Sequence, residues 1–316
     1  MPLAAGMLAA SAFSLQAQDV FPSRPITLVA PFPAGSVTDS VTRVLAQALQ
    51  EALGQTVVVD NKAGAQGTVG AAYVARTKPD GYTLLVASSG MFVAKNFYKT
   101  LPYEPVDSFT LVSGVGSTSM MFMVAENSPL KSVADLARAV QQEKPPVTMG
   151  FGSPSGQVAV ALFSTVTNGN PVPVSYRGIP QAMTDLAGGH VQVAVVDIGS
   201  GVAQMNSAKM RALAISAAAR SPAAPDVPTL QEAFPRASGS IETIIAIVGP
   251  AGIPAPVVEK LDAAIRAALA KTEVKARFQT LTTAVMPLST SQLVQRIKVD
   301  HPKWDALMKT AGIEPQ

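Results

Sequence analysis

The sequence predicts an α/β protein with two lobes, each built on a mainly parallel sheet. Short apolar runs typical of buried strands alternate with longer runs whose apolar positions repeat at helical spacing. A chain of 316 residues exceeds the usual size of a single core, so two lobes of about 100 to 150 residues are expected. Two glycine-bearing turns, at residues 33–39 and 150–156, each join such a strand to such a helix.

The first part of the chain has the most regular alternation. Strands are predicted at 26–32, 56–59 and 82–88, and helices at 38–53 and 68–76. Gly54 follows the first helix at the position where a left-handed residue commonly ends a helix. Because right-handed crossovers join successive parallel strands, these segments are expected to share one sheet.

The rest of the chain continues the alternation. Further strands are predicted at 109–115, 120–124, 147–151, 172–176, 191–197, 211–216 and 241–248, and a short helix at 180–186. Another helix is predicted after Ser132, with Asp135 three residues later completing a capping pattern. Two amphipathic helices finish the chain, one around 257–269 and one opening at Ser289. A break or kink is expected at Pro302, since proline removes a helix hydrogen bond.

The order of the segments predicts how the chain divides between the lobes. If the C-terminal helices pack back on the first lobe, the chain crosses between lobes twice. We therefore assign residues 19–113 and 243–316 to lobe 1 and residues 114–242 to lobe 2. Two crossings form a hinge, and they leave a cleft between the lobes for a ligand.

Composition excludes several classes of protein. Apolar residues make up 48% and charged residues 14% of the chain, which is ample for a buried core. The net charge of +3 comes without a basic stripe or a basic run interleaved with aromatic residues, so a nucleic-acid partner is not expected. The absence of cysteine excludes disulfides, thiol catalysis and cysteine-ligated zinc.

The N-terminal segment predicts export. Residues 1–17 carry no charge and are rich in alanine, leucine, methionine and serine, like the apolar core of a signal peptide. Residues 1–18 are therefore predicted to be a signal peptide, with cleavage after Ala17. No lysine or arginine precedes the apolar run, and a buried or frayed N-terminal helix is the alternative. No later run reaches the ~18 consecutive apolar residues that a membrane span requires.

Motifs of known catalytic sites do not occur in the sequence. The two histidines, His190 and His301, have no partner motif, and there is neither a nucleophile elbow nor a phosphate-binding Walker loop. Gly64, Gly67 and Gly70 do not have the spacing of the dinucleotide fingerprint. No pair of carboxylates stands out for acid–base chemistry. The sequence thus predicts no enzyme, no cofactor and no metal site.

The first glycine turn has the features of an anion site. A turn that opens a helix leaves about four backbone N–H groups without partners and adds the positive end of the helix dipole, which suits a carboxylate or a phosphate. The amides of Gly35 and Ser36 are the predicted donors, and a helix start satisfied by water is the alternative. Asp39 would repel an anion, so it is expected to stabilise the helix unless the ligand carries an amine or is reached through water. Phe32 is either a wall of the site or a core residue.

Other polar residues follow predicted strands at the ends where ligands gather in open α/β sheets. Ser88 and Ser89 follow the third strand, and an ordinary turn is the alternative. Asp197 closes a very apolar strand, where a charged side chain must be hydrogen-bonded or exposed. It either orients a water or ligand donor or serves as a cap. The second glycine turn offers Ser153, Ser155 and Gly156.

A set of motifs spread over the chain matches one known family. The main motifs are FPSRPI at 21–26, PFPAG at 31–35, DNKAGAQGT at 60–68 and PDGYTLL at 79–85. Supporting segments are LPY at 101–103, YRG at 176–178, GGHV at 188–191, RALA at 211–214, DVPT at 226–229 and PAG at 250–252. With these motifs the chain resembles the tripartite tricarboxylate transporter substrate-binding proteins, also called the Bug family. The resemblance covers nearly the whole chain after the leader.

This resemblance implies a two-lobed periplasmic-binding-protein fold of type II, the Venus flytrap. It implies a periplasmic receptor that captures a small organic acid and delivers it to membrane transporter subunits, or to a membrane receptor kinase as a sensing adaptor. The family holds a ligand carboxylate with backbone groups and waters at the turn matching 33–39, and the serine loops matching 88–90 and 153–156 complete the pocket with the acidic position matching Asp197. The implied ligand-binding residues are Phe32, Pro33, Ala34, Gly35, Ser36, Thr38, Asp39, Ser88, Ser89, Ser153, Ser155, Gly156 and Asp197.

The chain departs from the family pattern at three places. Ser36 stands where the family usually has a second glycine, and the apolar run 158–162 replaces a polar segment that commonly contains histidine. Met91 and Phe92 stand where smaller polar residues are common. These departures predict a more apolar pocket, suited to an aromatic or longer-chain acid. We expect the receptor to be a monomer.

Overall fold

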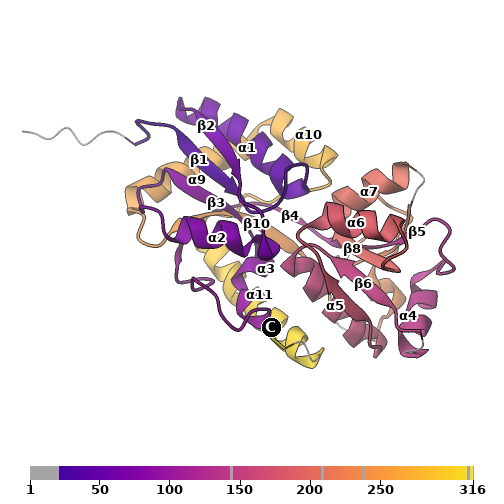
Figure 1. Ribbon diagram of the computed structural model, residues 1–316. Helices are drawn as coiled ribbons and strands as arrows, with labels where there is room; N and C mark the ends of the chain where they lie inside the picture. The colour runs from indigo at the N-terminus through magenta and orange to yellow at the C-terminus, as the bar shows by residue number, and fades with distance from the viewer. Residues whose placement is uncertain (1–20, 143–144, 208–209, 237–238, 312–313, 316) are drawn as a thin grey trace, which may run out of the picture.

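Two sheets, each covered by helices, form two lobes that lie side by side (Figure 1). The computed structural model describes residues 21–142, 145–207, 210–236, 239–311 and 314–315. The predicted signal peptide at residues 1–18 lies outside these residues. The α/β architecture with two lobes agrees with the sequence-based prediction.

The first sheet has the strand order β11-β4-β10-β3-β1-β2. Its strands are β1 (Ile26–Ala30), β2 (Val57–Asn61), β3 (Thr83–Ser88), β4 (Phe109–Thr118), β10 (Thr243–Pro250) and β11 (Ala284–Val285). β1 pairs in parallel with β2 and β3, as predicted from the helices between them. β10 runs antiparallel to β3 and β4, because β4 leads the chain out of this lobe and β10 leads it back.

Helices cover both faces of the first sheet. They are α1 (Val37–Leu53), α2 (Thr68–Ala75), α3 (Ser89–Phe92), α9 (Ala255–Ala270), α10 (Thr272–Thr280) and α11 (Thr290–Thr310), with short 3₁₀ turns at Ala65–Gly67 and Ala94–Asn96. α1 packs against α9 and α10 on one face through a cluster of leucine, valine and isoleucine side chains. Gly54 ends α1 in the left-handed conformation, as predicted. α10 was not predicted.

The second sheet has the order β7-β6-β8-β5-β9. Both sheets mix parallel and antiparallel pairs, whereas mainly parallel sheets were predicted. Its strands are β5 (Met120–Ala125), β6 (Thr148–Phe151), β7 (Val172–Ser175), β8 (Val193–Asp197) and β9 (Met210–Ile215). Its helices are α4 (Val133–Gln142), α5 (Pro154–Thr167), α6 (Ile179–Ala187), α7 (Ile198–Asn206) and α8 (Leu230–Ala233). β6 is parallel to β7 and β8, whereas β5 is antiparallel to β8 and β9. α7 was not predicted.

The chain leaves the first sheet after Thr118 and returns to it at Thr243. β4 pairs with β10 as far as Thr118, so this strand is longer than predicted and the outward crossing lies at Ser119. The division into residues 19–113 with 243–316 and residues 114–242 stays a prediction.

α11 links the lobes in addition to the two crossings. Of the break or kink expected at Pro302, the break is wrong, because the helix runs unbroken from Thr290 to Thr310. The kink stays a prediction. Trp304 and Met308, which follow the proline, are buried in the main hydrophobic cluster of the second lobe, while Leu293 packs with the first lobe. Anchors before and after the proline hold the helix together and offset the lost hydrogen bond.

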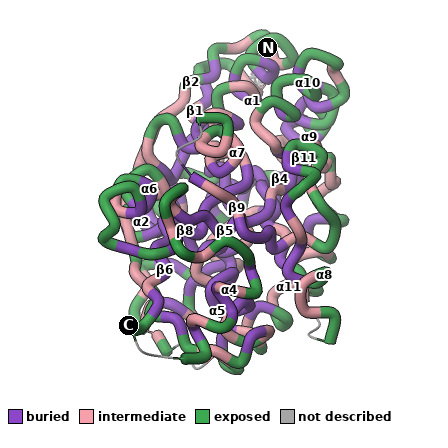
Figure 2. Tube along the Cα trace, turned by 90° about the vertical axis from the view of Figure 1, so that its right-hand side faces the viewer, coloured by how far each residue is buried: buried purple, intermediate pink, exposed green. Residues whose placement is uncertain are grey.

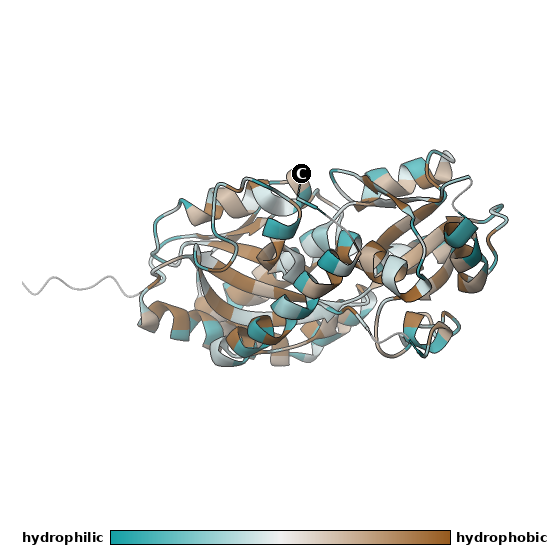
Figure 3. Ribbon diagram, turned by 90° about the horizontal axis from the view of Figure 1, so that it is seen from below, coloured by the Kyte–Doolittle hydropathy of each residue, from teal (hydrophilic) through white to brown (hydrophobic). Residues whose placement is uncertain are grey.

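The core follows the sheets. Buried segments run through the centre of both lobes and exposed ones cover the outside (Figure 2). Hydropathy shows the same division, since the strands are apolar and the polar residues lie on the outer helices and loops (Figure 3). Each sheet is therefore rigid by its packing, and the polar turns at its strand ends are held in fixed positions.

Candidate functional site

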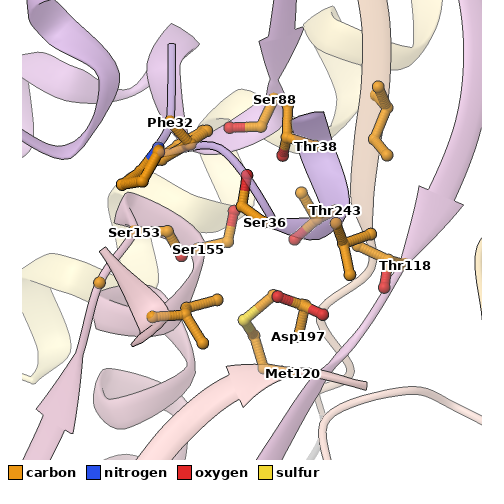
Figure 4. Close-up of a pocket in the computed structure, with 15 residues that line it drawn as sticks. Phe32, Ser36, Thr38, Ser88, Thr118, Met120, Ser153, Ser155, Asp197 and Thr243 are labelled. Atoms are coloured by element: carbon orange, nitrogen blue, oxygen red, sulfur yellow. The ribbon is translucent and has the colours of Figure 1, made fainter. Parts of the chain in front are cut away.

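A cavity lies between the lobes, where the carboxyl ends of strands from both sheets meet. The volume open to the centre of a water-sized sphere is about 40 Å³, more than the ~10–15 Å³ that a single water molecule needs. Among its lining residues are Phe32, Pro33, Ser36, Thr38, Ser88, Ser153, Ser155 and Asp197, all candidates from the sequence. It is also lined by Val37, Thr118, Met120, Gly152, Ile179, Thr243 and Ile245. Figure 4 shows the two glycine turns and Asp197 arranged around one space.

The first glycine turn is held by internal hydrogen bonds. Ser36 caps α1, and its Oγ accepts a hydrogen bond from the amide of Asp39 at 3.2 Å. The amide of Gly35 donates to Asp39 Oδ2 at 3.0 Å, and the amide of Ser36 donates to the carbonyl of Pro33 at 3.2 Å. The two amides predicted to hold a carboxylate therefore already have acceptors inside the turn.

The free donors of α1 are the next two amides. The backbone N–H groups of Val37 and Thr38 have no acceptor among the described residues, and both residues line the cavity. At the start of α5, the amide of Ser155 is likewise without an acceptor in this part of the chain. The positive ends of two long helices thus point backbone donors at the same space, an arrangement that favours an anion.

Asp39 belongs to the scaffold of the turn. It is 3% exposed, its Oδ1 accepts from Asn61 Nδ2 at 2.8 Å, and its Oδ2 accepts from Arg43 Nε at 3.1 Å. Burial opposes ionisation of Asp39, but hydrogen bonds from Arg43, Gly35 and Asn61 outweigh it and lower the pKa of this carboxyl below its ordinary value. Asp39 therefore stabilises the start of α1 as an anion and is not among the lining residues.

The second glycine turn divides its two serines between structure and cavity. Ser153 caps α5, and its Oγ accepts a hydrogen bond from the amide of Gly156 at 3.1 Å. Ser155 is 1% exposed, and its Oγ has no hydrogen-bond partner among the described residues. Gly156 is thus occupied by the cap, whereas Ser155 is free to meet a ligand.

Four buried hydroxyls that line the cavity lack partners within the described part of the chain. They are those of Ser88, Thr118, Ser155 and Thr243. They come from β3, β4, α5 and β10, hence from both lobes, and Thr118 and Thr243 are direct neighbours across β4 and β10. Each buried polar group left without a partner costs about 1–3 kcal/mol. Native proteins satisfy such groups with protein, water or ligand, so four of them in one cavity indicate a polar occupant.

Some candidates from the sequence do not line the cavity. Ser89 Oγ accepts a hydrogen bond from the amide of Ile244 at 2.7 Å and so ties α3 to β10. Ala34, Gly35 and Gly156 belong to the turns but not to the lining. These residues shape the site without facing it.

Asp197 faces the cavity from the second lobe and caps α7. Its Oδ1 accepts from the amide of Ser200 at 2.8 Å, and its Oδ2 accepts from Ser200 Oγ at 3.1 Å. Burial raises the pKa of Asp197 above its ordinary value, and the hydrogen bonds from Ser200 oppose that shift only in part. Among the described lining residues there is no lysine, arginine or histidine to pair with it. The donors that this lining offers are helix-end amides and hydroxyls, and it holds no cationic side chain.

The apolar walls include Phe32 and Pro33, as predicted, but not the residues at which the chain departs from the family pattern. The run 158–162 is buried in the core of the second lobe, and Met91 and Phe92 pack in the first lobe, so none of these residues lines the cavity. Their apolar character fits the core and does not enlarge the pocket. The walls are formed by Phe32, Pro33, Val37, Met120, Ile179 and Ile245.

Sequence reasoning missed the threonines at the lobe crossing. Thr118 lies in the polar run Ser117–Ser119 between two apolar strands, and Thr243 opens the strand that returns from the second lobe. Polar residues at a predicted crossing between lobes are the sequence feature that could have indicated these two lining residues. Their pairing could not be seen because the two threonines are far apart in sequence.

Comparison with known proteins identifies the family. Residues 41–313 match the model of the tripartite tricarboxylate transporter family receptor. A protein of Pseudomonas sp. strain P51, described as a UPF0065 protein in the tcbD-tcbE intergenic region, is 32% identical over 97% of this chain and 92% of its own. The chain belongs to the tripartite tricarboxylate transporter receptor family.

Solved structures of this family have the same fold. The periplasmic binding protein BugD superposes with a TM-score of 0.86 at 32% identity, covering 94% of this chain and 100% of BugD. The Rhodopseudomonas palustris protein Rpa4515, solved with adipate, superposes with a TM-score of 0.87 at 28% identity, covering 94% and 100%. The family is one of transporter receptors, and BugD is described as a periplasmic binding protein, so this chain is a binding protein and not an enzyme. No helix in the described residues has the length and apolar character to cross a membrane.

Proposed function

We propose that this protein is a periplasmic receptor that captures a small organic carboxylate in the cavity between its lobes. We further propose that it delivers the acid to the membrane subunits of a tripartite tricarboxylate-type transporter. The observation that carries the proposal is the convergence of four unpartnered hydroxyls, those of Ser88, Thr118, Ser155 and Thr243, on one cavity of the described chain. Hydroxyls and free helix amides are donors that a carboxylate can accept from directly or through water.

The proposed contacts divide by element. A carboxylate accepts hydrogen bonds from the amides of Val37 and Thr38 at the start of α1 and from Ser155 at the start of α5. Because these donors belong to opposite lobes, the acid binds the closed state better than the open one and shifts the population toward closure. Ser88 and the two threonines hold the rest of the ligand or its bridging waters.

The lining favours a ligand with a sizeable apolar part. Phe32, Met120, Ile179 and Ile245 present hydrocarbon surface around the polar donors. Burial of such surface contributes about 25 cal/mol per Å², which favours a longer-chain or aromatic acid over a short one. We therefore propose that adipate and benzoate bind better than succinate.

A thermal-shift series tests the proposal directly. A ligand that binds only the native state raises its stability by about 2.7 kcal/mol at 100 times its Kd. We expect a higher melting temperature with adipate or benzoate and a smaller rise with succinate. Unchanged melting temperatures with all three acids, and with a wider panel of mono- and dicarboxylates, would contradict the carboxylate receptor.

A matched variant separates binding in the cavity from binding elsewhere. The double variant Thr118→Val and Thr243→Val removes two unpartnered hydroxyls of the described chain and keeps the branched shape of both side chains. We expect this variant to fold at least as stably as the original protein and to lose most of the shift produced by adipate. A full shift in the variant would place the acid outside this cavity.

Delivery to a membrane partner is tested with the loaded protein. Detergent-solubilised transporter subunits should bind the receptor more tightly when the thermal-shift ligand is present, since closure changes the surface that both lobes present together. Capture of a receptor kinase in place of the transporter would point to signalling. Native mass spectrometry of the same sample tests the expected monomer.

A further inference from the structure

The turn between β2 and α2 has an unusual backbone. Gly64, Ala65, Gln66 and Gly67 follow one another with φ values of 147°, 42°, 54° and 96°. Glycine accepts such values easily, but Ala65 and Gln66 carry a Cβ that disfavours them. Side-chain-bearing residues persist in this conformation only where the surroundings hold them, and such positions cluster at binding and switch regions.

Gln66 reaches from the first lobe to the second. Its side chain is buried, and Nε2 donates to Ser175 Oγ at 2.8 Å, at the end of β7. Nε2 also lies 3.4 Å from Gln157 Oε1 on α5. Both acceptors belong to the second lobe, so these hydrogen bonds exist only while the lobes are together. The Oε1 of Gln66 is buried without a partner among the described residues.

The same turn supports a wall of the cavity. A Cβ on Gly67 would lie 3.3 Å from Cζ of Phe32 and 3.6 Å from Sδ of Met91, so the backbone of the turn packs closely behind Phe32. Phe32 is itself a lining residue of the cavity (Figure 4). Tyr98 Oη donates a hydrogen bond to the carbonyl of Ala65 at 3.1 Å and thereby also holds the turn in place. The turn thus contacts both the ligand wall and the opposite lobe.

We propose that Gln66 is a positioning residue that fastens the two lobes over an occupied cavity. It sets the affinity for the bound carboxylate without touching it, and this inference rests on the proposed receptor function. Because the hydrogen bonds to Ser175 and Gln157 form only in the closed state, they stabilise that state selectively. The backbone conformation of Ala65 and Gln66 is retained because it directs the glutamine side chain across the gap.

Replacement by glycine separates the two roles of Gln66. Gln66→Gly removes the side chain that crosses the gap and also removes the penalty for a Cβ at positive φ. We expect Kd for adipate to rise about 3- to 10-fold, as for the loss of one or two neutral hydrogen bonds. We expect the melting temperature of the ligand-free protein to stay the same or rise. A residue that served only folding would lower that temperature and leave Kd unchanged.

The neighbouring residue provides a matched control. Ala65→Gly relieves the same backbone conformation, but Ala65 is exposed and its side chain is a single methyl group. Ala65→Gly should keep the original Kd. Ser175→Ala, on an exposed residue of the second lobe, should weaken binding like Gln66→Gly, and the double variant Gln66→Gly with Ser175→Ala should weaken it little further.

Closure is measured independently of affinity. The chain has no cysteine, so Val58→Cys on β2 and Asn206→Cys at the end of α7 give one spin label on each lobe. Electron–electron double resonance with and without adipate then reports the distance between lobes. We expect Gln66→Gly to shift this distribution toward open states and Ala65→Gly to leave it unchanged.

The outcomes distinguish this inference from the receptor function itself. Equal Kd values and equal distance distributions for Gln66→Gly and Ala65→Gly would overturn the role of Gln66 while adipate binding still supports the receptor. If neither adipate nor any other tested acid binds, the receptor function fails, and the fastening role is then decided on the ligand-free distributions. Identical ligand-free distributions in the two variants would overturn it.

Discussion

Two buried aspartates lie at the N-terminal ends of helices near the cavity, Asp39 in the first turn of α1 and Asp197 at the start of α7. Asp39 accepts hydrogen bonds from Gly35, Arg43 and Asn61, and its pKa is lowered. Asp197 accepts hydrogen bonds from the amide and the hydroxyl of Ser200, and burial raises its pKa. Both residues are aspartates at the start of a helix, yet their pKa values are shifted in opposite directions.

The difference shows what separates a scaffold residue from a site residue here. Asp39 points back into its own turn, where a cation and two neutral donors satisfy it. Asp197 lines the cavity, where no cation faces it among the described lining residues, so only neutral donors of its own helix start stabilise its charge. Burial alone therefore does not set the direction of the pKa shift, which depends on whether a cation such as Arg43 also reaches the carboxyl.

Replacing each aspartate with alanine should give the largest difference in stability between the two sites. Asp39→Ala removes the acceptor of three donors and leaves Arg43 and Asn61 without it, so we expect the free energy of unfolding to fall by about 2–4 kcal/mol. Asp197→Ala loses a helix cap worth about 1 kcal/mol and regains part of that because a buried charge is gone. Urea unfolding of both variants measures the difference. Equal falls in the free energy of unfolding would mean that the hydrogen bonds to Asp39 stabilise the fold no more than the cap formed by Asp197.

The pH dependence of stability should have opposite signs at the two sites. The lowered pKa of Asp39 contributes stability that is present above its unfolded pKa and lost as the pH falls through the folded value. The raised pKa of Asp197 contributes stability that is present below its unfolded pKa and lost as the pH rises through the folded value. Acidification should therefore weaken the contribution of Asp39 and strengthen that of Asp197.

Difference curves against Asn variants isolate each carboxyl. The unfolding free energy of the original protein minus that of Asp39→Asn should decrease on acidification from about pH 6 to about pH 3. The same difference for Asp197→Asn should increase over that interval. Two curves with the same slope would show that the environments of the two carboxyls are alike after all.

Much of the fold could be predicted because it depends on local patterns. The alternation of apolar runs predicts most strands and helices of both lobes, the two glycine turns open helices at Ser36 and Ser153, and Gly54 ends a helix. Pro302 misleads because the burial of Trp304 and Met308, a tertiary effect, keeps α11 continuous. Local rules hold where no distant contact competes with them.

The site could be predicted only in part for the same reason. Ser155 and Asp197 follow strands closely, and their place at the cavity follows from the order of elements. The pairing of Thr118 with Thr243 and the reach of Gln66 to Ser175 join segments more than a hundred residues apart, which no local pattern reveals. The family pattern suggests a place at the pocket for the apolar run 158–162, but the packing of α5 puts that run in the core.

The two serines of the second glycine turn show the same contrast between a residue that stabilises a helix start and a residue that faces the cavity, with smaller expected effects. Ser153→Ala removes the cap of α5, so we expect stability to fall by about 1 kcal/mol, with adipate affinity changed only through the shape of the turn. Ser155→Ala removes a buried hydroxyl without a partner in the described chain, so stability should stay the same or rise. Affinity for adipate should then fall about 3- to 10-fold, as for a lost hydrogen bond. Calorimetric titration and urea unfolding of both variants separate the two effects, and a stability loss for Ser155→Ala with unchanged affinity would reverse the assignment of cap and contact.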